Sequence, residues 1–159
     1  MKFTVSFAAL AAGAFQAVAG QTVYFAGDST MARSGANDAA KALVAKGAQV
    51  VLSTQTPNNQ WETGTFEPGA PRFVGYVSTA HRALASSSVT WVDHFAAVTK
   101  MYQKLGNQKV NSLYPRDHTH TSPEAADLIA KAFVQAINEE MNGRTSLKSL
   151  IKTPVSNVY

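Results

Sequence analysis

The hydrophobic positions of this chain fall into short apolar runs and longer stretches with helical spacing. Three apolar runs have the length of buried strands: 22–26, 49–53 and 89–92. Apolar residues recur at helical spacing over four stretches: 39–46, 73–84, 95–105 and 125–141. Strands that alternate with helices predict βαβ units and a mostly parallel sheet, so the expected fold class is α/β.

Capping and turn residues mark the expected ends of these helices. The expected helix starts are Asp38, Asp93 and Ser122, the last followed by Pro123 in the first helical position. The expected helix ends are Gly47, Gly106 and Gly143. Segment 54–70 is rich in Pro, Gly and Asn, which predicts a long loop. Segment 144–159 is predicted to be a polar C-terminal tail with little to bury.

The first nineteen residues have the pattern of a secretory signal peptide. Lys2 supplies a positive charge, an apolar stretch follows from Val5 to Val18, and small residues at 17–19 suit a cleavage site. The stretch is too short and too rich in Ala and Gly for a membrane span. We therefore expect residues 1–19 to be removed, 20–143 to form one domain, and the protein to be secreted. The alternative is a buried N-terminal helix.

Composition narrows the classes of function. The sequence has 159 residues and no cysteine, which excludes disulfides and zinc sites built on cysteine. The formal net charge is +4, and the charged residues are dispersed along the chain. Dispersed charge argues against a nucleic-acid partner, and a mild basic excess is compatible with an acidic polymer.

Two polar segments stand where an α/β sheet places its ligands. Ser29 follows the first apolar run, and Asp117 and His120 immediately precede the last helix. Both positions are expected at the carboxyl edge of the sheet. The three-residue spacing lets the Asp117 carboxylate accept the imidazole Nδ1–H of His120, which leaves Nε2 to take a serine proton. From the residues alone, Ser29 as an ordinary turn former remains the alternative.

The residues around these segments resemble a known family. Four segments are similar to the SGNH (GDSL-like) hydrolases, above all to the fungal rhamnogalacturonan acetylesterases: TVYFAGDSTMA (22–32), STQTPNNQWETGTF (53–66), DHTHTSP (117–123) and TSLKS (145–149). The resemblance implies a flavodoxin-like, three-layer α/β/α fold with a parallel sheet. It also implies a secreted serine esterase that removes acetyl groups from rhamnogalacturonan in pectin and needs neither a metal nor an organic cofactor.

The resemblance assigns roles to three residues. It implies Ser29 as the nucleophile, His120 as the general base and Asp117 as the carboxylate that orients the base. The backbone N–H of Ser29 would donate to the oxyanion hole, and no other donor can be assigned. His118 lies within the same block, but it is adjacent to Asp117 and is expected to point elsewhere.

Other residues have both a functional and a structural explanation. Asp93 and His94 form a second Asp/His pair, although Asp93 is better explained as a helix cap. Four residues of the long loop and its end would suit sugar stacking and hydrogen bonding: Trp61, Asn58, Asn59 and Arg72. A tryptophan in a long loop is as often a structural anchor.

The chain departs from the family between Ser29 and segment 53–66. Family members carry two further blocks there, which supply a glycine N–H and an asparagine amide to the oxyanion hole. Both blocks are missing; Gly35–Asp38 matches the G-x-N-D pattern, but only six residues past Ser29 and at an expected helix start. We therefore expect a shortened fold with strands near 22–26, 49–53 and 89–92.

This departure also leaves a second function open. The alternative is a non-catalytic or nearly inactive remnant that keeps Asp117 and His120 but lacks a working oxyanion hole. The expected partner in the first case is an acetylated acidic polysaccharide. We expect a monomer, with neither a nucleic acid nor a membrane as partner.

Overall fold

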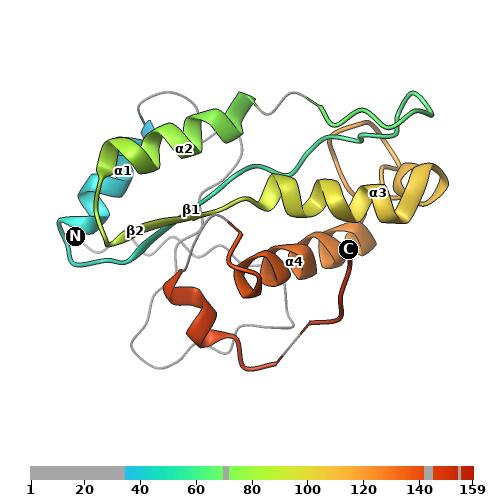
Figure 1. Cartoon of the computed structure of the whole chain (residues 1–159). Coiled ribbons are helices and arrows are strands. Elements are labelled where there is room, and N and C mark those ends of the chain that lie inside the picture. Colours follow the sequence, from blue (N-terminus) through green and yellow to red (C-terminus); the bar gives the residue numbers. More distant parts are fainter. Residues whose placement is uncertain (1–34, 70–71, 142–144, 154) are drawn as a thin grey trace.

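The computed structural model describes residues 35–69, 72–141, 145–153 and 155–159 (Figure 1). Its elements run in the order α1 (Gly35–Val44), β1 (Val50–Ser53), α2 (Arg72–Leu84), β2 (Val89–Val92), α3 (His94–Ser112), α4 (Pro123–Asn138) and the short 3₁₀ segment η2 (Ser146–Leu150). The strand predicted near 22–26 lies outside the described residues, as does Ser29. No helix in the part that is described is long and apolar enough to cross a membrane.

The two described strands form a small parallel sheet. β1 pairs with β2 in the register Val50↔Val89 through Ser53↔Val92. The helix α2 connects them, which makes a βαβ unit of the kind that the alternating pattern predicts. The predicted bounds of β2 are confirmed, and β1 begins one residue later than predicted.

Helices cover both faces of this sheet. Figure 1 shows α1 and α2 on one side of the strands and α4 on the other. Residues of β1 alternate between the two sides of the sheet. Val50 and Leu52 pack with α1 and α2, whereas Val51 packs against a hydrophobic cluster formed around α3 and α4. The described residues therefore form a mixed α/β architecture in three layers around a small parallel sheet.

Two of the expected helix starts are confirmed. The Asp93 carboxylate accepts a hydrogen bond from Ala96 N (3.0 Å), and the Ser122 hydroxyl accepts one from Ala125 N (3.2 Å). Both side chains thereby satisfy backbone donors that the first helical turn leaves free. The expected helix start at Asp38 is wrong, because α1 already begins at Gly35 and Asp38 lies within its first turn.

The C-terminal segment buries more than its polar composition suggests. Thr145 and Leu147 are buried, and several apolar residues further along pack against the core around α3 and α4: Leu150, Ile151, Val158 and Tyr159. Gln135 of α4 fastens the end of the chain, because its Oε1 accepts a hydrogen bond from Val158 N (2.9 Å). The expectation of a tail with little to bury is therefore wrong. Leu147 and Leu150 lie three residues apart on η2, and the remaining apolar residues dock outside any helix or strand.

The end of α4 differs from the prediction, and α3 has a second helical part beyond its predicted end. α4 ends at Asn138, where Glu139 follows as the C-cap and Glu140 adopts a positive φ of 55°. Gly143, the expected end, lies outside the described residues. In α3 the first helical part ends at Gly106 as expected, because the φ of 76° and ψ of 172° there are not helical, but a second helical part follows directly and extends the element to Ser112. The glycine thus breaks the helical path without ending the element.

The backbone at Gly106 leads to a stability prediction. Its φ/ψ combination is accessible almost only to glycine, and holding another residue there costs about 1–3 kcal/mol. A Cβ added at Gly106 meets no atom within 4 Å, so the cost is one of backbone conformation alone. We expect Gly106→Ala to lower the free energy of unfolding by about 1–3 kcal/mol, measured by urea denaturation.

Gly75 provides the matched control for this substitution. It lies inside α2, its φ is not positive, and an added Cβ again meets nothing within 4 Å. Gly75→Ala is therefore expected to raise the free energy of unfolding by about 0.4–1 kcal/mol. Equal effects of the two substitutions would contradict the conformational explanation.

His94, the first residue of α3, is buried and makes stability depend on pH. Burial lowers the pKa of its imidazole to about 4, Nδ1 has no hydrogen-bond partner, and the ring meets Phe133 edge-on at 5.3 Å. Between pH 6.5 and pH 4 the unfolded chain binds this proton and the folded chain does not, so stability falls as the pH is lowered. The loss is about 3 kcal/mol across that window and saturates below it.

Chemical denaturation at a series of pH values measures this dependence. We expect His94→Leu to flatten the stability profile between pH 4 and pH 6.5. His81→Leu, which removes a partly exposed histidine from α2, is the matched control. A wild-type stability that does not fall between pH 6.5 and pH 4 would contradict the lowered pKa of His94.

Candidate active site

The loop between α3 and α4 holds a carboxylate enclosed by donors from the residues that follow it. Asp117 Oδ1 accepts hydrogen bonds from Thr119 N (2.8 Å) and His120 N (2.7 Å), and Oδ2 lies 2.8 Å from His120 Nδ1. The backbone N–H of His120, followed by its imidazole and the N–H of Thr119, holds the pKa of Asp117 well below its usual range. Asp117 is therefore ionised at any ordinary pH.

This arrangement fixes the orientation of the His120 ring. With Nδ1–H donating to the carboxylate, the neutral imidazole presents Nε2 as a proton acceptor. The His120 side chain is 78% exposed, and none of the described residues provides a hydrogen-bond partner to Nε2. An ionised carboxylate, an oriented imidazole and an open Nε2 are the features that a serine hydrolase needs in its general base.

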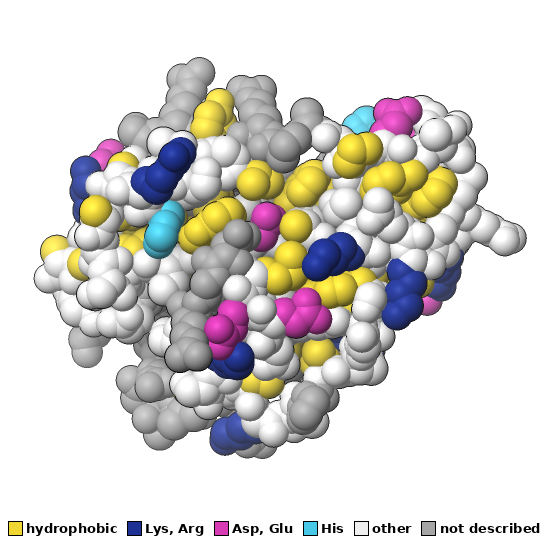
Figure 2. Space-filling model, viewed as in Figure 1, with side chains coloured by type: hydrophobic (Ala, Val, Ile, Leu, Met, Phe, Trp, Pro, Cys, Tyr) yellow, Lys and Arg dark blue, Asp and Glu magenta, His cyan; other side chains and the backbone are white. Residues whose placement is uncertain are grey.

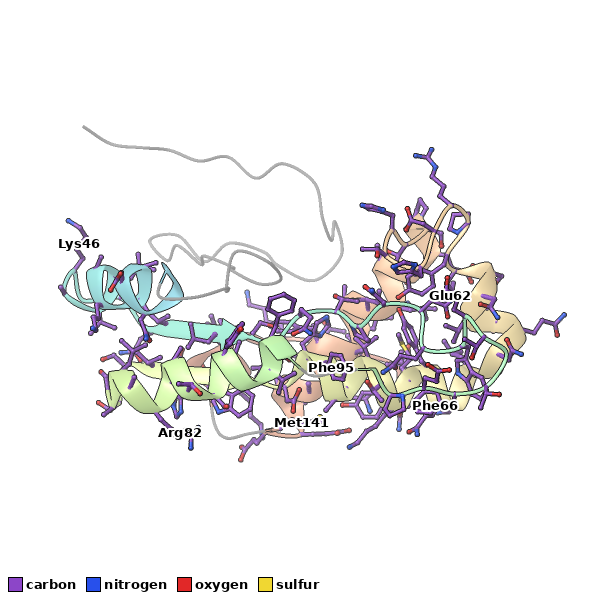
Figure 3. All side chains as sticks on the ribbon, turned by 90° about the horizontal axis from the view of Figure 1, so that it is seen from above. Lys46, Glu62, Phe66, Arg82, Phe95 and Met141 are labelled. Carbon is purple, nitrogen blue, oxygen red and sulfur yellow. The ribbon has the colours of Figure 1, made fainter. Side chains whose placement is uncertain are left out.

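His118, the alternative base, is turned away from Asp117. Its Nδ1 lies 3.5 Å from Glu62 Oε1, on the neighbouring loop (Glu62 is labelled in Figure 3). The expectation that His118 points elsewhere is thereby confirmed. The structure thus brings together Asp117 and His120 and separates His118 from them.

The loop that follows β1 is fastened to the loop that carries His120. Asn59 N donates a hydrogen bond to the carbonyl of His118 (2.8 Å), and the Tyr114 hydroxyl donates one to the carbonyl of Pro57 (2.9 Å). The Tyr102 hydroxyl lies 2.9 Å from that of Tyr114. Burial raises the pKa of Tyr114 to about 12, so both phenols stay protonated. Segments 53–66 and 117–123, two of the four that resemble the family, are therefore neighbours in space.

Two of the four residues considered for sugar binding have structural roles instead. Trp61 Nε1 donates to the carbonyl of Tyr102 (2.8 Å), and the indole packs against the ring of Phe66 at 5.2 Å. Asn59 Nδ2 donates to Asn111 Oδ1 (2.6 Å), and its Oδ1 accepts from Trp61 N. Trp61 is accordingly an anchor of the loop, the structural alternative that the sequence left open. The Arg72 side chain lies outside what the structure describes.

Asp93 is a cap and not a second catalytic carboxylate. Besides the N–H of Ala96, its Oδ1 accepts the hydroxyl of Thr54 (3.2 Å), and Thr54 Oγ1 accepts Phe95 N (2.8 Å). Thr54 is buried at the end of β1 and was not among the predicted functional residues. It ties the start of the long loop to the first turn of α3.

A pocket lies between the long loop and the starts of α2 and α3. Its volume is about 370 Å³, and it is lined by residues 55–60 together with Glu67, Gly69, Phe73 and Phe95. Of these residues the sequence indicated only Asn58 and Asn59. A pocket depends on how distant segments pack, so no periodic signal could have revealed it.

The other predicted site residues have less structural support. Gly35–Asp38, the segment with the G-x-N-D pattern, forms the first turn of α1. Within the described ranges no group of three or more His, Cys, Asp or Glu could hold a metal ion. Because Ser29 lies outside those ranges, the approach of Ser29 to His120 stays a prediction.

Comparison with known proteins finds one informative relative. A rhamnogalacturonan acetylesterase of Emericella nidulans is 46% identical to this chain over 100 residues. The aligned part makes up 63% of this chain and 40% of the relative, so the chain spans less than half the length of that protein. No protein-family model matches the chain. The resemblance seen in the sequence is confirmed, and the chain is a partial relative of this acetylesterase.

Proposed function

We propose that the chain is a secreted serine esterase of the SGNH type that removes acetyl groups from rhamnogalacturonan. The observation that carries the proposal is the Asp117–His120 pair, in which the carboxylate holds Nδ1 and leaves Nε2 open. The relative named as a rhamnogalacturonan acetylesterase supports the reaction and the substrate class. The signal-like residues 1–19 support secretion.

The proposed reaction proceeds in two acyl-transfer steps. His120 Nε2 takes the hydroxyl proton of Ser29 as Oγ attacks the acetyl carbonyl, and then gives that proton to the departing sugar oxygen. Water, deprotonated by the same Nε2, next attacks the acetyl-serine; acetate leaves and the proton returns to Ser29. Asp117 stabilises the imidazolium form of His120 in both steps. No metal or organic cofactor takes part in this mechanism.

The small positive net charge of the molecule is compatible with an acidic polysaccharide partner. The acidic polymer expected as substrate would meet a monomer with a small positive net charge. Figure 2 shows Lys and Arg side chains interspersed with Asp and Glu on one face, without a large field of one sign. Binding would therefore depend on local contacts more than on long-range attraction.

A nearly inactive remnant is the second candidate, and one specific observation favours it. The two family blocks that complete the oxyanion hole are missing between Ser29 and segment 53–66. Without those donors the negative charge on the tetrahedral intermediate is stabilised mainly by the Ser29 N–H. The two candidates thus share the base and differ in how fast the reaction proceeds.

Release of acetate from acetylated rhamnogalacturonan tests the proposal. The purified chain is compared with its Ser29→Ala variant, which keeps Asp117 and His120 but lacks the proposed nucleophile. We expect release above the uncatalysed rate by the wild type and none by the variant. Equal release by both proteins would exclude the serine mechanism.

A further inference from the structure

The Asp117–His120 pair lies on an exposed loop whose internal bonds do not set its direction. Residues 115–120 are all exposed, and a hydrogen bond from Ser122 N to the carbonyl of Leu113 (2.8 Å) closes the base of the loop. The donors to Asp117 come from the same loop, so they fix the shape of the turn only. A base must point its open nitrogen at the hydroxyl that it serves, which requires a contact from outside the loop.

Two polar contacts join residues 115–120 to the loop that follows β1, and they differ in strength. His118 Nδ1 lies 3.5 Å from Glu62 Oε1, with both side chains more than half exposed, and ion pairs of this kind contribute little. The carbonyl of His118 accepts a hydrogen bond from Asn59 N at 2.8 Å. No other hydrogen bond in the described part of the chain joins residues 115–120 to a different segment. The direction of the turn therefore depends mainly on Asn59.

Asn59 is held by an amide pair with Asn111, in the last turn of α3. Asn59 Nδ2 donates to Asn111 Oδ1 (2.6 Å), and Asn111 Nδ2 donates to the carbonyl of Trp61 (3.2 Å). Asn59 Oδ1 in turn accepts a hydrogen bond from Trp61 N (3.0 Å). A backbone N–H only donates and a carbonyl only accepts, so each amide has one possible orientation. The amide pair thereby fixes the turn 59–61, and with it the N–H of Asn59.

Other hydrogen bonds hold the same loop against α3 on either side of Asn59. The Tyr114 hydroxyl donates to the carbonyl of Pro57 (2.9 Å), and Trp61 Nε1 donates to the carbonyl of Tyr102 (2.8 Å). Because these bonds do not involve the Asn59 side chain, we expect the loop to stay attached to α3 when the amide pair is removed. Loss of the pair should then release the direction of Asn59 without unfolding the loop.

We propose that Asn59 and Asn111 are positioning residues, which set the direction of His120 Nε2 through the carbonyl of His118. Both act through the backbone and take no part in proton transfer. Their effect on catalysis rests on the proposed function. Their effect on the order of residues 118–120 rests on the contacts alone, so the two effects can be measured separately.

Backbone order in the full-length chain tests the contact. Order parameters are measured by ¹⁵N relaxation for the wild type, Asn59→Ala and Asn111→Ala, which remove the two ends of one hydrogen bond. We expect the values at residues 118–120 to fall from about 0.85 in the wild type to below about 0.6 in both variants. Unchanged values at these residues, or an equal fall along the whole chain, would overturn the proposal.

Gln108→Ala is the matched control, because it removes an exposed amide side chain from the same helix. It should leave the order of residues 118–120 at the wild-type value. The ¹⁵N shifts of the His120 imidazole provide a second control, since the bond from Nδ1 to Asp117 is made within the loop. They should report the same tautomer in the wild type and in all variants.

The rate at which a fluorophosphonate labels Ser29 tests the consequence for catalysis. A small misplacement of a catalytic group can cost about 10²-fold, so we expect a loss of about 10- to 100-fold in Asn59→Ala and in Asn111→Ala. The double variant should be no slower than the slower single variant, because both substitutions remove the same bond. Rates are compared at a temperature where thermal unfolding shows every variant folded. Equal labelling of the wild type and both variants would overturn the positioning role.

The positioning role and the proposed function can fail separately. A wild type that is not labelled at Ser29 would contradict the esterase, and the order parameters would still decide whether the amide pair holds the loop. A labelled wild type with the same loop order in every variant would overturn the positioning role and leave the esterase proposal intact.

Discussion

A fluorophosphonate probe is expected to label Ser29 in the folded chain, and His120→Ala is expected to slow this labelling by about 10²–10⁴-fold. A serine hydroxyl is a weak nucleophile until a base accepts its proton, and the structure leaves Nε2 of His120 open for that purpose. The labelling rate at Ser29, followed by mass spectrometry of the digested protein, measures the effect.

His118→Ala is the matched control for this experiment. Both histidines lie in the same exposed loop, but the His118 ring faces Glu62 and contributes nothing to the Asp117 carboxylate. We expect His118→Ala to leave the labelling rate within about twofold of the wild type, because no proton transfer depends on it. Labelling that survives His120→Ala and disappears in His118→Ala would show that His118 is the base.

Asp117→Asn separates orientation from proton transfer. The amide can replace an acceptor oxygen by an N–H donor opposite Nδ1, which favours the imidazole tautomer with its proton on Nε2. That tautomer cannot accept the serine proton. A loss of labelling in Asp117→Asn, with the unfolding transition retained, would assign the carboxylate to orientation of the base.

The part of the site that could be predicted is the part built from neighbours in sequence. Asp117 and His120 are three residues apart, so a single turn brings them together whatever the rest of the chain does. The caps at Asp93 and Ser122 are local in the same way. In each case the residue type and its spacing are sufficient to specify the contact.

Features that depend on packing between distant segments could not be predicted. The hydrogen bonds from Tyr114 to Pro57 and from Asn59 to His118 join residues that no periodic pattern relates. The same holds for the pocket around Gln60 and for the docking of Leu147 against α4. Gly106 does break the helix with the positive φ that is typical of helix ends, but the second helical part that follows it directly was not predicted.

The rate of acetate release is the prediction that decides between the two candidate functions. One oxyanion-hole donor is worth about 2.7–4 kcal/mol of transition-state stabilisation. Loss of two donors would cost on the order of 5–8 kcal/mol if their effects add, which corresponds to roughly four to six decades in rate. Groups that act as a unit are not additive, so the lower end of that range is the firmer expectation.

We therefore expect this chain to hydrolyse acetylated rhamnogalacturonan or p-nitrophenyl acetate at least about 10⁴-fold more slowly than the acetylesterase of Emericella nidulans. Asn37 is the one residue in a G-x-N-D pattern that could replace a missing donor, and it lies in the first turn of α1. Because we assign it to the helix, Asn37→Ala should change the rate by less than about twofold. Near-normal turnover of the wild type, or a hundredfold loss in Asn37→Ala, would mean that Gly35–Asp38 has rebuilt the oxyanion hole. The missing blocks would then no longer argue against an efficient enzyme.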